Sequence, residues 1–115
     1  MKHQELFKGL IRLHILHHAA QEEFYGQWMI QELARHGYNL SPGTLYPMLH
    51  GMERSGYLVS RKERLGRTFR RLYRATALGR DANKVAKLRV RELGGELVEG
   101  PGPRPPKPAR PERGR

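Results

Sequence analysis

Residues 38–58 constrain the fold of this chain most strongly, because they mark both ends of one short helix. Ser41 is a favourable N-cap, since its hydroxyl can accept a hydrogen bond from a free backbone N–H of the first turn. Pro42 suits the first helical position and Gly56 the C-terminal end. Apolar residues recur between these ends at helical spacing, which predicts a buried face made of Leu45, Leu49 and Met52.

The opposite face of this helix carries small donors, an aromatic ring and an imidazole near its N-terminus. A short capped helix with such groups at its front end is typical of proteins that read bases in the major groove of DNA. We therefore predict DNA contacts by Ser41, Thr44, Tyr46, Pro47 and His50. The alternative is that Ser41 only caps the helix and Tyr46 only packs against the body of the protein.

Composition limits the class of protein. A chain of 115 residues with 37% hydrophobic content can form one small domain, and a net charge of +11 favours a polyanionic partner such as nucleic acid. There is no cysteine, no signal peptide and no apolar run near the ~20 residues that span a bilayer. Motifs for phosphate binding, nucleophilic catalysis or cofactors are also absent. We expect a cytoplasmic protein that is not an enzyme and needs no cofactor.

Most of the positive charge lies in two stretches. Residues 60–74 hold seven Lys or Arg against one acid, and residues 100–115 hold five against one. The first stretch is a predicted hairpin, where cations can neutralise DNA phosphates or enter a minor groove. We predict DNA contacts there by Lys62, Arg64, Arg67, Arg70 and Arg71. Because side chains alternate along a strand, only some of these can face DNA at once.

The order of the expected elements defines the fold class. Apolar periodicity and stop signals predict helices over residues 6–20, 26–36 and 41–55, with residues 21–24 as a connection. Strands over 57–63 and 69–75 follow, joined by a loop that contains Gly66. This order predicts a mainly α fold with a small β-hairpin: a winged helix-turn-helix domain over residues 1–75. Residues 100–115 contain six prolines, and we predict that they are disordered.

A final helix is predicted over residues 76–98, with Thr76 as its cap. Gly94 and Gly95 are expected to interrupt it near its end. Its apolar stripe lies outside the winged-helix unit and therefore needs a partner, either this helix or the first helix of a second copy. The predicted dimerisation residues over 76–99 and the first helix are Leu78, Ala82, Ala86, Val90, Leu93, Leu97, Leu6 and Leu10.

Three blocks of sequence resemble the PadR-like transcriptional regulators, a family of winged-helix repressors. They are Tyr25-Gly26, residues 40–49 (LSPGTLYPML) and residues 73–80 (YRATALGR). The resemblance implies a homodimer, joined through its C-terminal helix, that represses transcription from a palindromic double-stranded DNA operator until an effector releases it. The chain departs from the family pattern in having Gln27 and Trp28 where members often carry tyrosine and an acid.

Two features leave further roles open. His17 and His18 follow His14 by about one turn of the first helix. The three can bind Zn²⁺ or Ni²⁺, with Glu22 or Glu23 nearby, act as a proton-sensitive interface, or simply pack at a dimer contact. Trp28 is the only tryptophan and serves either as a packing anchor or as a wall of an effector cavity. A third reading is a basic architectural module that binds DNA without choosing a sequence.

Overall fold

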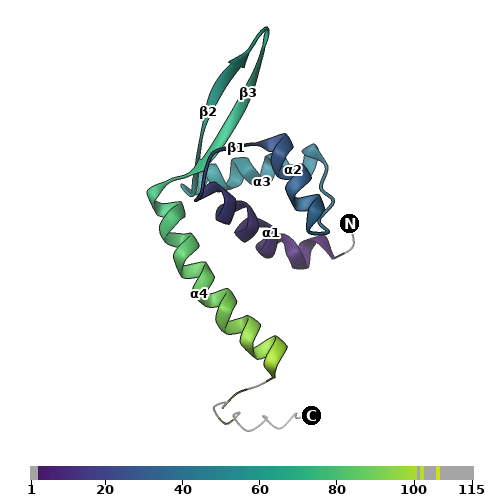
Figure 1. The fold of residues 1–115 in the computed structure, drawn as a ribbon, viewed down its shortest axis with the longest axis vertical. Helices are drawn as coiled ribbons and strands as arrows, with labels where there is room; N and C mark the ends of the chain where they lie inside the picture. The colour runs from purple at the N-terminus through teal and green to yellow at the C-terminus, as the bar shows by residue number, and fades with distance from the viewer. Residues whose placement is uncertain (1–2, 101, 103–105, 107–115) are drawn as a thin grey trace, which may run out of the picture.

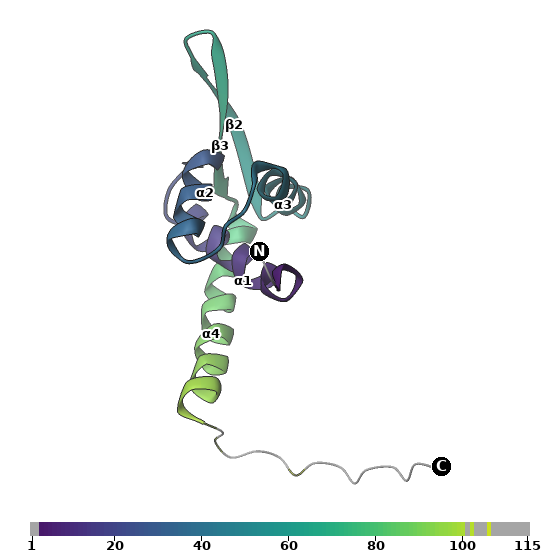
Figure 2. The same cartoon turned by 90° about the vertical axis from the view of Figure 1, so that its right-hand side faces the viewer.

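The computed structural model describes residues 3–100, 102 and 106. Its elements in chain order are α1 (Gln4–Ala19), β1 (Phe24–Tyr25), α2 (Gly26–Arg35), α3 (Pro42–Arg54), β2 (Leu58–Leu65), β3 (Thr68–Ala75) and α4 (Ala77–Glu99). The first three helices form a body, from which the β2–β3 hairpin and α4 extend in opposite directions (Figures 1 and 2). The predicted fold class, a winged helix-turn-helix followed by one more helix, is confirmed. No helix among the described residues is long and apolar enough to cross a membrane.

The sheet has three antiparallel strands in the order β1-β3-β2, one strand more than predicted. The connection expected over residues 21–24 ends in β1, where Phe24 pairs with Tyr73 and Tyr25 with Leu72. A strand of two residues is too short to show alternation in the sequence. The wing strands β2 and β3 run further than expected, so their turn contains only Gly66 and Arg67, with Gly66 at a φ of 62°.

The core lies where the three helices of the body meet the base of the wing. Completely buried side chains come from all of these elements and include Ile11, Ile15, Met29, Leu33, Leu45, Leu49, Leu58 and Tyr73. The predicted buried face of α3 is confirmed, and Met48 joins it. This packing fixes α3 on the body while leaving its opposite side in solvent.

The helix ends agree with the predicted signals in all but one case. Gly37 and Gly56 have φ angles of 90° and 88°, and the Thr76 hydroxyl accepts a hydrogen bond of 3.0 Å from the Gly79 backbone N–H. Ser41 is the N-cap residue of α3, but its hydroxyl makes no capping bond and instead donates to the Thr44 hydroxyl at 3.3 Å. An N-cap hydroxyl accepts from the second or third residue of the helix, and here the Thr44 backbone N–H donates to the Ser41 carbonyl instead, at 3.0 Å.

The prediction that Gly94 and Gly95 interrupt the last helix was wrong, because α4 continues through both to Glu99. A glycine in a helix interior costs only about 1 kcal/mol relative to alanine, which the remaining turns of a long helix can absorb. The prediction of a disordered tail over residues 100–115 concerns positions outside the described residues, apart from Gly100, Gly102 and Pro106.

Candidate nucleic-acid interface

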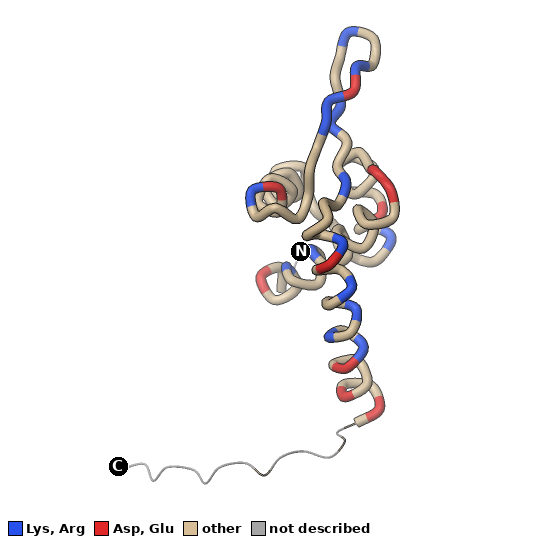
Figure 3. The backbone as a smooth tube through the Cα atoms, turned by 90° about the vertical axis from the view of Figure 1, so that its left-hand side faces the viewer, with Lys and Arg blue, Asp and Glu red and all other residues tan. Residues whose placement is uncertain are grey.

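The register of the wing separates its cations into two faces. Lys62 pairs with Arg71, and Arg64 pairs with Phe69, so these side chains share the face that carries the buried Tyr73 further down. Arg61 and Arg70 project from the other face, together with Glu63 and Arg74. Figure 3 shows basic residues along the length of the wing, with the acid confined to one strand. Only the first of these faces is free of acidic residues.

The second face of the wing is largely neutralised. Arg61 makes two hydrogen bonds to the carboxylate of Glu23, of 2.8 and 2.9 Å, and Glu63 accepts a hydrogen bond from the Tyr25 hydroxyl. The Arg61 partner lowers the pKa of Glu23, and the Glu63 carboxylate raises the pKa of Tyr25. Arg70 lies over the Tyr25 ring, 4.7 Å from its centre. These contacts join β2 and β3 to β1 and the residue before it. Because Arg61 is paired with Glu23, its charge is not available to DNA.

The cations of the first face make no ion pair with any described acid. Arg71 instead donates to the Ser60 hydroxyl at 3.0 Å, and Ser60 donates to Glu53 of α3 at 2.8 Å. Arg64 donates to the Gly66 carbonyl at 2.9 Å, and so closes the turn at the wing tip. The relay from Glu53 through Ser60 to Arg71 ties the wing to α3. It therefore fixes the position of the wing relative to the helix predicted to read bases.

The predicted α3 residues occupy different environments. Ser41, Pro47 and His50 are exposed, as DNA contacts require. Thr44 is half-buried and lines a groove between α1 and α3. Tyr46 is also half-buried and packs against the core. Its ring covers Gly26, where a Cβ would overlap the ring and its hydroxyl.

A concave surface of about 560 Å³ lies where α3, the start of α2 and the wing meet. It is lined by Tyr25, Gly26, Gln27, Tyr46, Phe69, Arg70 and Arg71. The first turn of a helix has backbone N–H groups without partners inside that helix, and such groups favour phosphate. Sequence reasoning missed the start of α2 as part of this surface, because only the fold brings it beside the wing.

The predicted dimerisation residues are exposed or half-buried in the single chain. Leu6 is 74% exposed, and Leu97 is 73% exposed. Leu10, Leu78, Val90 and Leu93 are also exposed, whereas Ala82 and Ala86 are half-buried. Val85 and Leu88, which were not predicted, are exposed as well. An apolar surface of this extent on a protruding helix is typical of a protein–protein contact.

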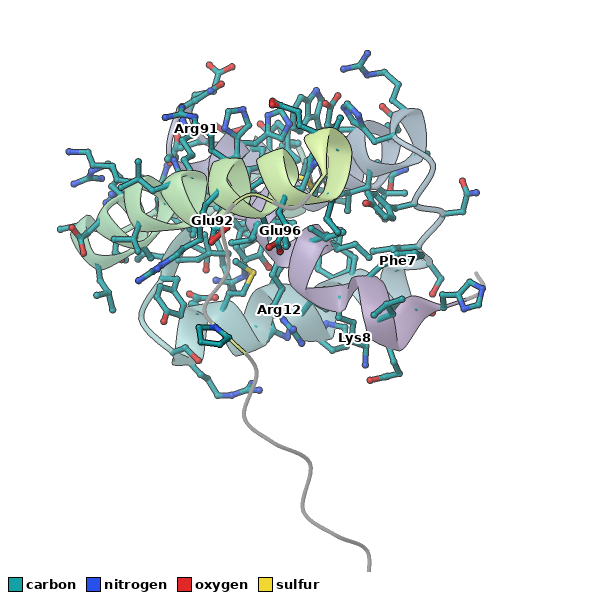
Figure 4. All side chains as sticks on the ribbon, turned by 90° about the horizontal axis from the view of Figure 1, so that it is seen from below. Phe7, Lys8, Arg12, Arg91, Glu92 and Glu96 are labelled. Atoms are coloured by element: carbon teal, nitrogen blue, oxygen red, sulfur yellow. The ribbon has the colours of Figure 1, made fainter. Side chains whose placement is uncertain are left out.

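A groove of about 840 Å³ lies between α1 and α3, and its rim is basic. Lys8 and Arg12 of α1 and Arg54 of α3 line it. Figure 4 shows Glu92 and Glu96 on the edge of α4 turned toward α1 in that view, whereas Arg91 projects from the opposite edge. The last two turns of α4 are therefore acidic where the groove is basic.

The rings of the three predicted metal ligands adjoin in a row, since the ring centres of His14 and His18 are 5.2 Å apart and those of His17 and His18 are 5.1 Å apart. His14 lies beside His36, with ring centres 4.5 Å apart, and burial together with the charges of His36 and His18 lowers the pKa of His14. His18 Nε2 is 3.2 Å from a carboxylate oxygen of Glu32. His17 Nε2 lies 3.2 Å from the side-chain nitrogen of Gln21. Glu23 is paired with Arg61 rather than with a histidine.

Trp28 is 43% exposed and lines a cavity of about 490 Å³. The other walls include His18, Phe24, Tyr25, Glu32 and Leu72. The cavity combines aromatic walls with the carboxylates of Glu22, Glu23 and Glu32. Aromatic walls suit small planar ligands.

This arrangement of helices and sheet defines a winged helix-turn-helix protein with a basic wing. The chain belongs to the transcriptional regulator PadR-like family, whose model matches residues 15–85. It is 48% identical over 97 residues to transcriptional regulator Rv3488 of Mycobacterium tuberculosis, covering 84% of this chain and 91% of that protein. Membership of the family makes the chain a transcriptional regulator and implies DNA binding.

Solved structures agree with the fold. A PadR family regulator from Eggerthella lenta has a TM-score of 0.72 at 27% identity, covering 83% of this chain and 84% of that one. A PadR-like regulator from Bacillus cereus has a TM-score of 0.74 at 24% identity, covering 83% and 94%.

Proposed function

We propose that this protein is a sequence-specific repressor that binds a palindromic DNA operator as a homodimer. The observation that carries the proposal is the fixed placement of α3 beside an unneutralised basic face of the wing. In this arrangement α3 enters the major groove, where the exposed His50 reaches base edges and Ser41 reaches phosphate. Lys62, Arg64, Arg67 and Arg71 neutralise the flanking backbone.

The geometry ranks the remaining predicted contacts. Arg70 is held over Tyr25, and Tyr46 covers Gly26. We therefore assign both side chains to the walls of the concave surface and not to base contacts. Thr44 and Pro47 both line the groove beside α1. We therefore assign sequence choice chiefly to the exposed front of α3.

Dimerisation uses the protruding α4 and the outer face of α1. The leucines and valines of α4 are exposed in one chain, and a second copy supplies the same apolar surface. Charge complementarity favours packing of α4 from one copy along α1 of the other. Glu92 and Glu96 then approach Lys8 and Arg12.

Release from DNA requires an effector, and we propose the Trp28 cavity as its site. The cavity lies between α1, α2 and the base of the sheet, so a ligand there touches the elements that support α3 and the wing. A ligand that binds the DNA-incompetent dimer more tightly shifts the population toward it. Titration of candidate planar aromatic ligands, followed through Trp28 fluorescence, tests this assignment. A ligand that quenches Trp28 but leaves DNA affinity unchanged would contradict it.

A gel-shift comparison tests the proposed repressor. The protein is titrated into DNA from upstream of its own gene and into random DNA of equal length, at rising salt. We expect the preference for upstream DNA to grow as salt removes non-specific binding, and His50→Ala to reduce it. Equal affinity for both DNAs at every salt concentration would instead favour an architectural module. Removal of residues 100–115 should leave a repressor's preference intact and strip an architectural binder of much of its affinity.

A further inference from the structure

We propose that His14, Glu32 and His36 form a binding site for a divalent transition-metal ion of the Zn²⁺ or Ni²⁺ type that joins α1 to α2. Each of the three residues offers one ligand atom, and these atoms lie within 4.8 Å of one another. Two imidazole nitrogens and one carboxylate oxygen are ligands that both ions accept. A fourth donor is close, because His18 Nε2 lies 3.2 Å from Glu32 Oε2.

The orphaned nitrogen of His14 distinguishes this cluster from an ordinary hydrogen-bond network. His14 Nε2 is buried and has no hydrogen-bond partner among the described residues. Buried polar atoms in folded proteins nearly always have one. The Glu32 carboxylate lies within hydrogen-bond distance of His36 Nε2, at 3.1 Å, and of His18 Nε2, at 3.2 Å. A hydrogen-bond network therefore gives these two imidazoles a partner but provides none for His14 Nε2. A metal ion at the cluster supplies the missing partner.

Small movements of the three side chains are enough to bring their ligand atoms to metal-binding distances. Ligand atoms around tetrahedral Zn²⁺ are about 3.3 Å apart, so no pair of the three groups needs to approach by more than about 1.5 Å, and His36 Nε2 already lies 3.1 Å from Glu32 Oε2. His36 is exposed at the end of α2, which leaves its ring free to turn. Arg35 now holds both oxygens of Glu32 at 3.1 Å, but its side chain is 71% exposed and can swing into solvent.

The proposed ligand set differs from the one that sequence spacing suggested. His17 follows His14 by three residues on α1, yet its Nε2 lies beside Gln21, and none of its atoms belongs to the cluster. Metal binding through α1 alone would use His14, His17 and His18. Metal binding through the inter-helix cluster requires Glu32 and His36. The two possibilities make opposite predictions for His17 and His36.

Calorimetric titration of the full chain with Zn²⁺ tests the site, using untagged protein freed of metal by chelator. We expect one ion per chain, with affinity reduced about 100-fold or more in His14→Gln and in His36→Gln. His17→Gln is the matched control and should bind as the parent does. Ni²⁺ titration gives a second readout, because Trp28 lies 5.2 Å from His18 between ring centres and its fluorescence should be quenched.

Three results would overturn the proposal. They are no binding by the parent chain, unchanged affinity in His36→Gln, or loss of binding in His17→Gln alone. Circular dichroism checks the fold of each variant, and the exposed His36→Gln decides the matter if His14→Gln fails to fold. The metal-site proposal does not depend on the proposed repressor function. A chain that binds Zn²⁺ but shows no preference for an operator would support the metal site and refute the sequence-specific repressor.

Discussion

At the scale of single residues, two glycines explain why separate blocks of the sequence belong together. Tyr46 of α3 covers Gly26 at the start of α2, and the Tyr57 carbonyl occupies the space beside Gly79 of α4. A Cβ at Gly79 would also lie 3.1 Å from the carbonyl carbon of Tyr57 and 3.3 Å from the Ala75 Cβ. The sequence marked both glycines as parts of motifs, but the neighbours that require them come from other elements.

A pair of Gly→Ala substitutions in α4 tests this close approach. Gly79→Ala should destabilise the protein by about 1–3 kcal/mol, because the Tyr57 carbonyl accepts a hydrogen bond from the Thr76 N–H at 3.1 Å and cannot easily move. Gly95→Ala is the control: a Cβ there meets no atom within 4 Å, and alanine should stabilise the helix by about 0.5–1 kcal/mol. Urea denaturation measures both. Equal effects would refute the steric account.

The ion pair between Glu23 and Arg61 should appear in the pH dependence of stability. Arg61 lowers the pKa of Glu23 from its ordinary value of 4.5, so the stabilisation is complete above that value and is lost as pH falls through the lowered one. Glu23→Gln should therefore melt below the parent at neutral pH, by a small amount because the pair is exposed. The two melting temperatures should converge in acid. A constant difference across this range would rule out the ion pair as its source.

At the scale of elements, the wing shows what sequence reasoning could and could not supply. Its strands, its turn glycine and its excess of cations were all predictable from residues 57–75. The sequence could not predict which of these cations lack an acidic partner, because Arg61 is neutralised by Glu23, a residue 38 positions away. Similarly, β1 escaped prediction because it exists only through pairing with β3. Periodicity reports local structure, whereas these contacts depend on how distant segments meet.

The cations on the free face and in the turn of the wing should control the salt dependence of DNA binding. Replacing Lys62 or Arg67 with alanine should weaken binding to specific and random DNA alike and reduce the slope of log K against log salt by about 1 for each phosphate that is no longer neutralised. Lys84→Ala, on α4, removes an equal charge away from the wing and should leave the slope unchanged. Fluorescence anisotropy over a salt series provides the measurement. A similar change in slope for all three variants would mean that only net charge matters.

At the scale of the whole molecule, α4 and the wing project from opposite ends of one body (Figure 1). The sequence predicted an unpartnered apolar stripe on α4, and most of its residues are indeed exposed in the single chain. It did not predict the basic groove beside α1, because Arg54 joins Lys8 and Arg12 only after folding. The histidines show the same limit: spacing on α1 picked out His14, but Glu32 and His36 come from α2 and its C-terminal end.

Dimerisation through α4 predicts a change of oligomeric state on substitution of the stripe. Leu93→Asp places a carboxylate on the exposed apolar surface and should convert the dimer to a monomer, with loss of operator binding. Lys84→Asp adds an acid to α4 about 180° around the helix from Leu93 and should remain dimeric. Sedimentation equilibrium distinguishes the two states. A dimeric Leu93→Asp variant would place the interface elsewhere.

Footprinting tests the central claim most directly, namely that two copies of α3 read a palindrome while the wings hold its flanks. The protein is bound to upstream DNA in the presence of excess random DNA, and protection from hydroxyl radicals and from methylation at guanine N7 is mapped on both strands. We predict two symmetric protected segments whose centres are about 10 base pairs apart or a multiple of that distance, with protection of guanine N7 in the major groove that is weaker in His50→Ala. Uniform protection without symmetry, unchanged by His50→Ala, would contradict the account.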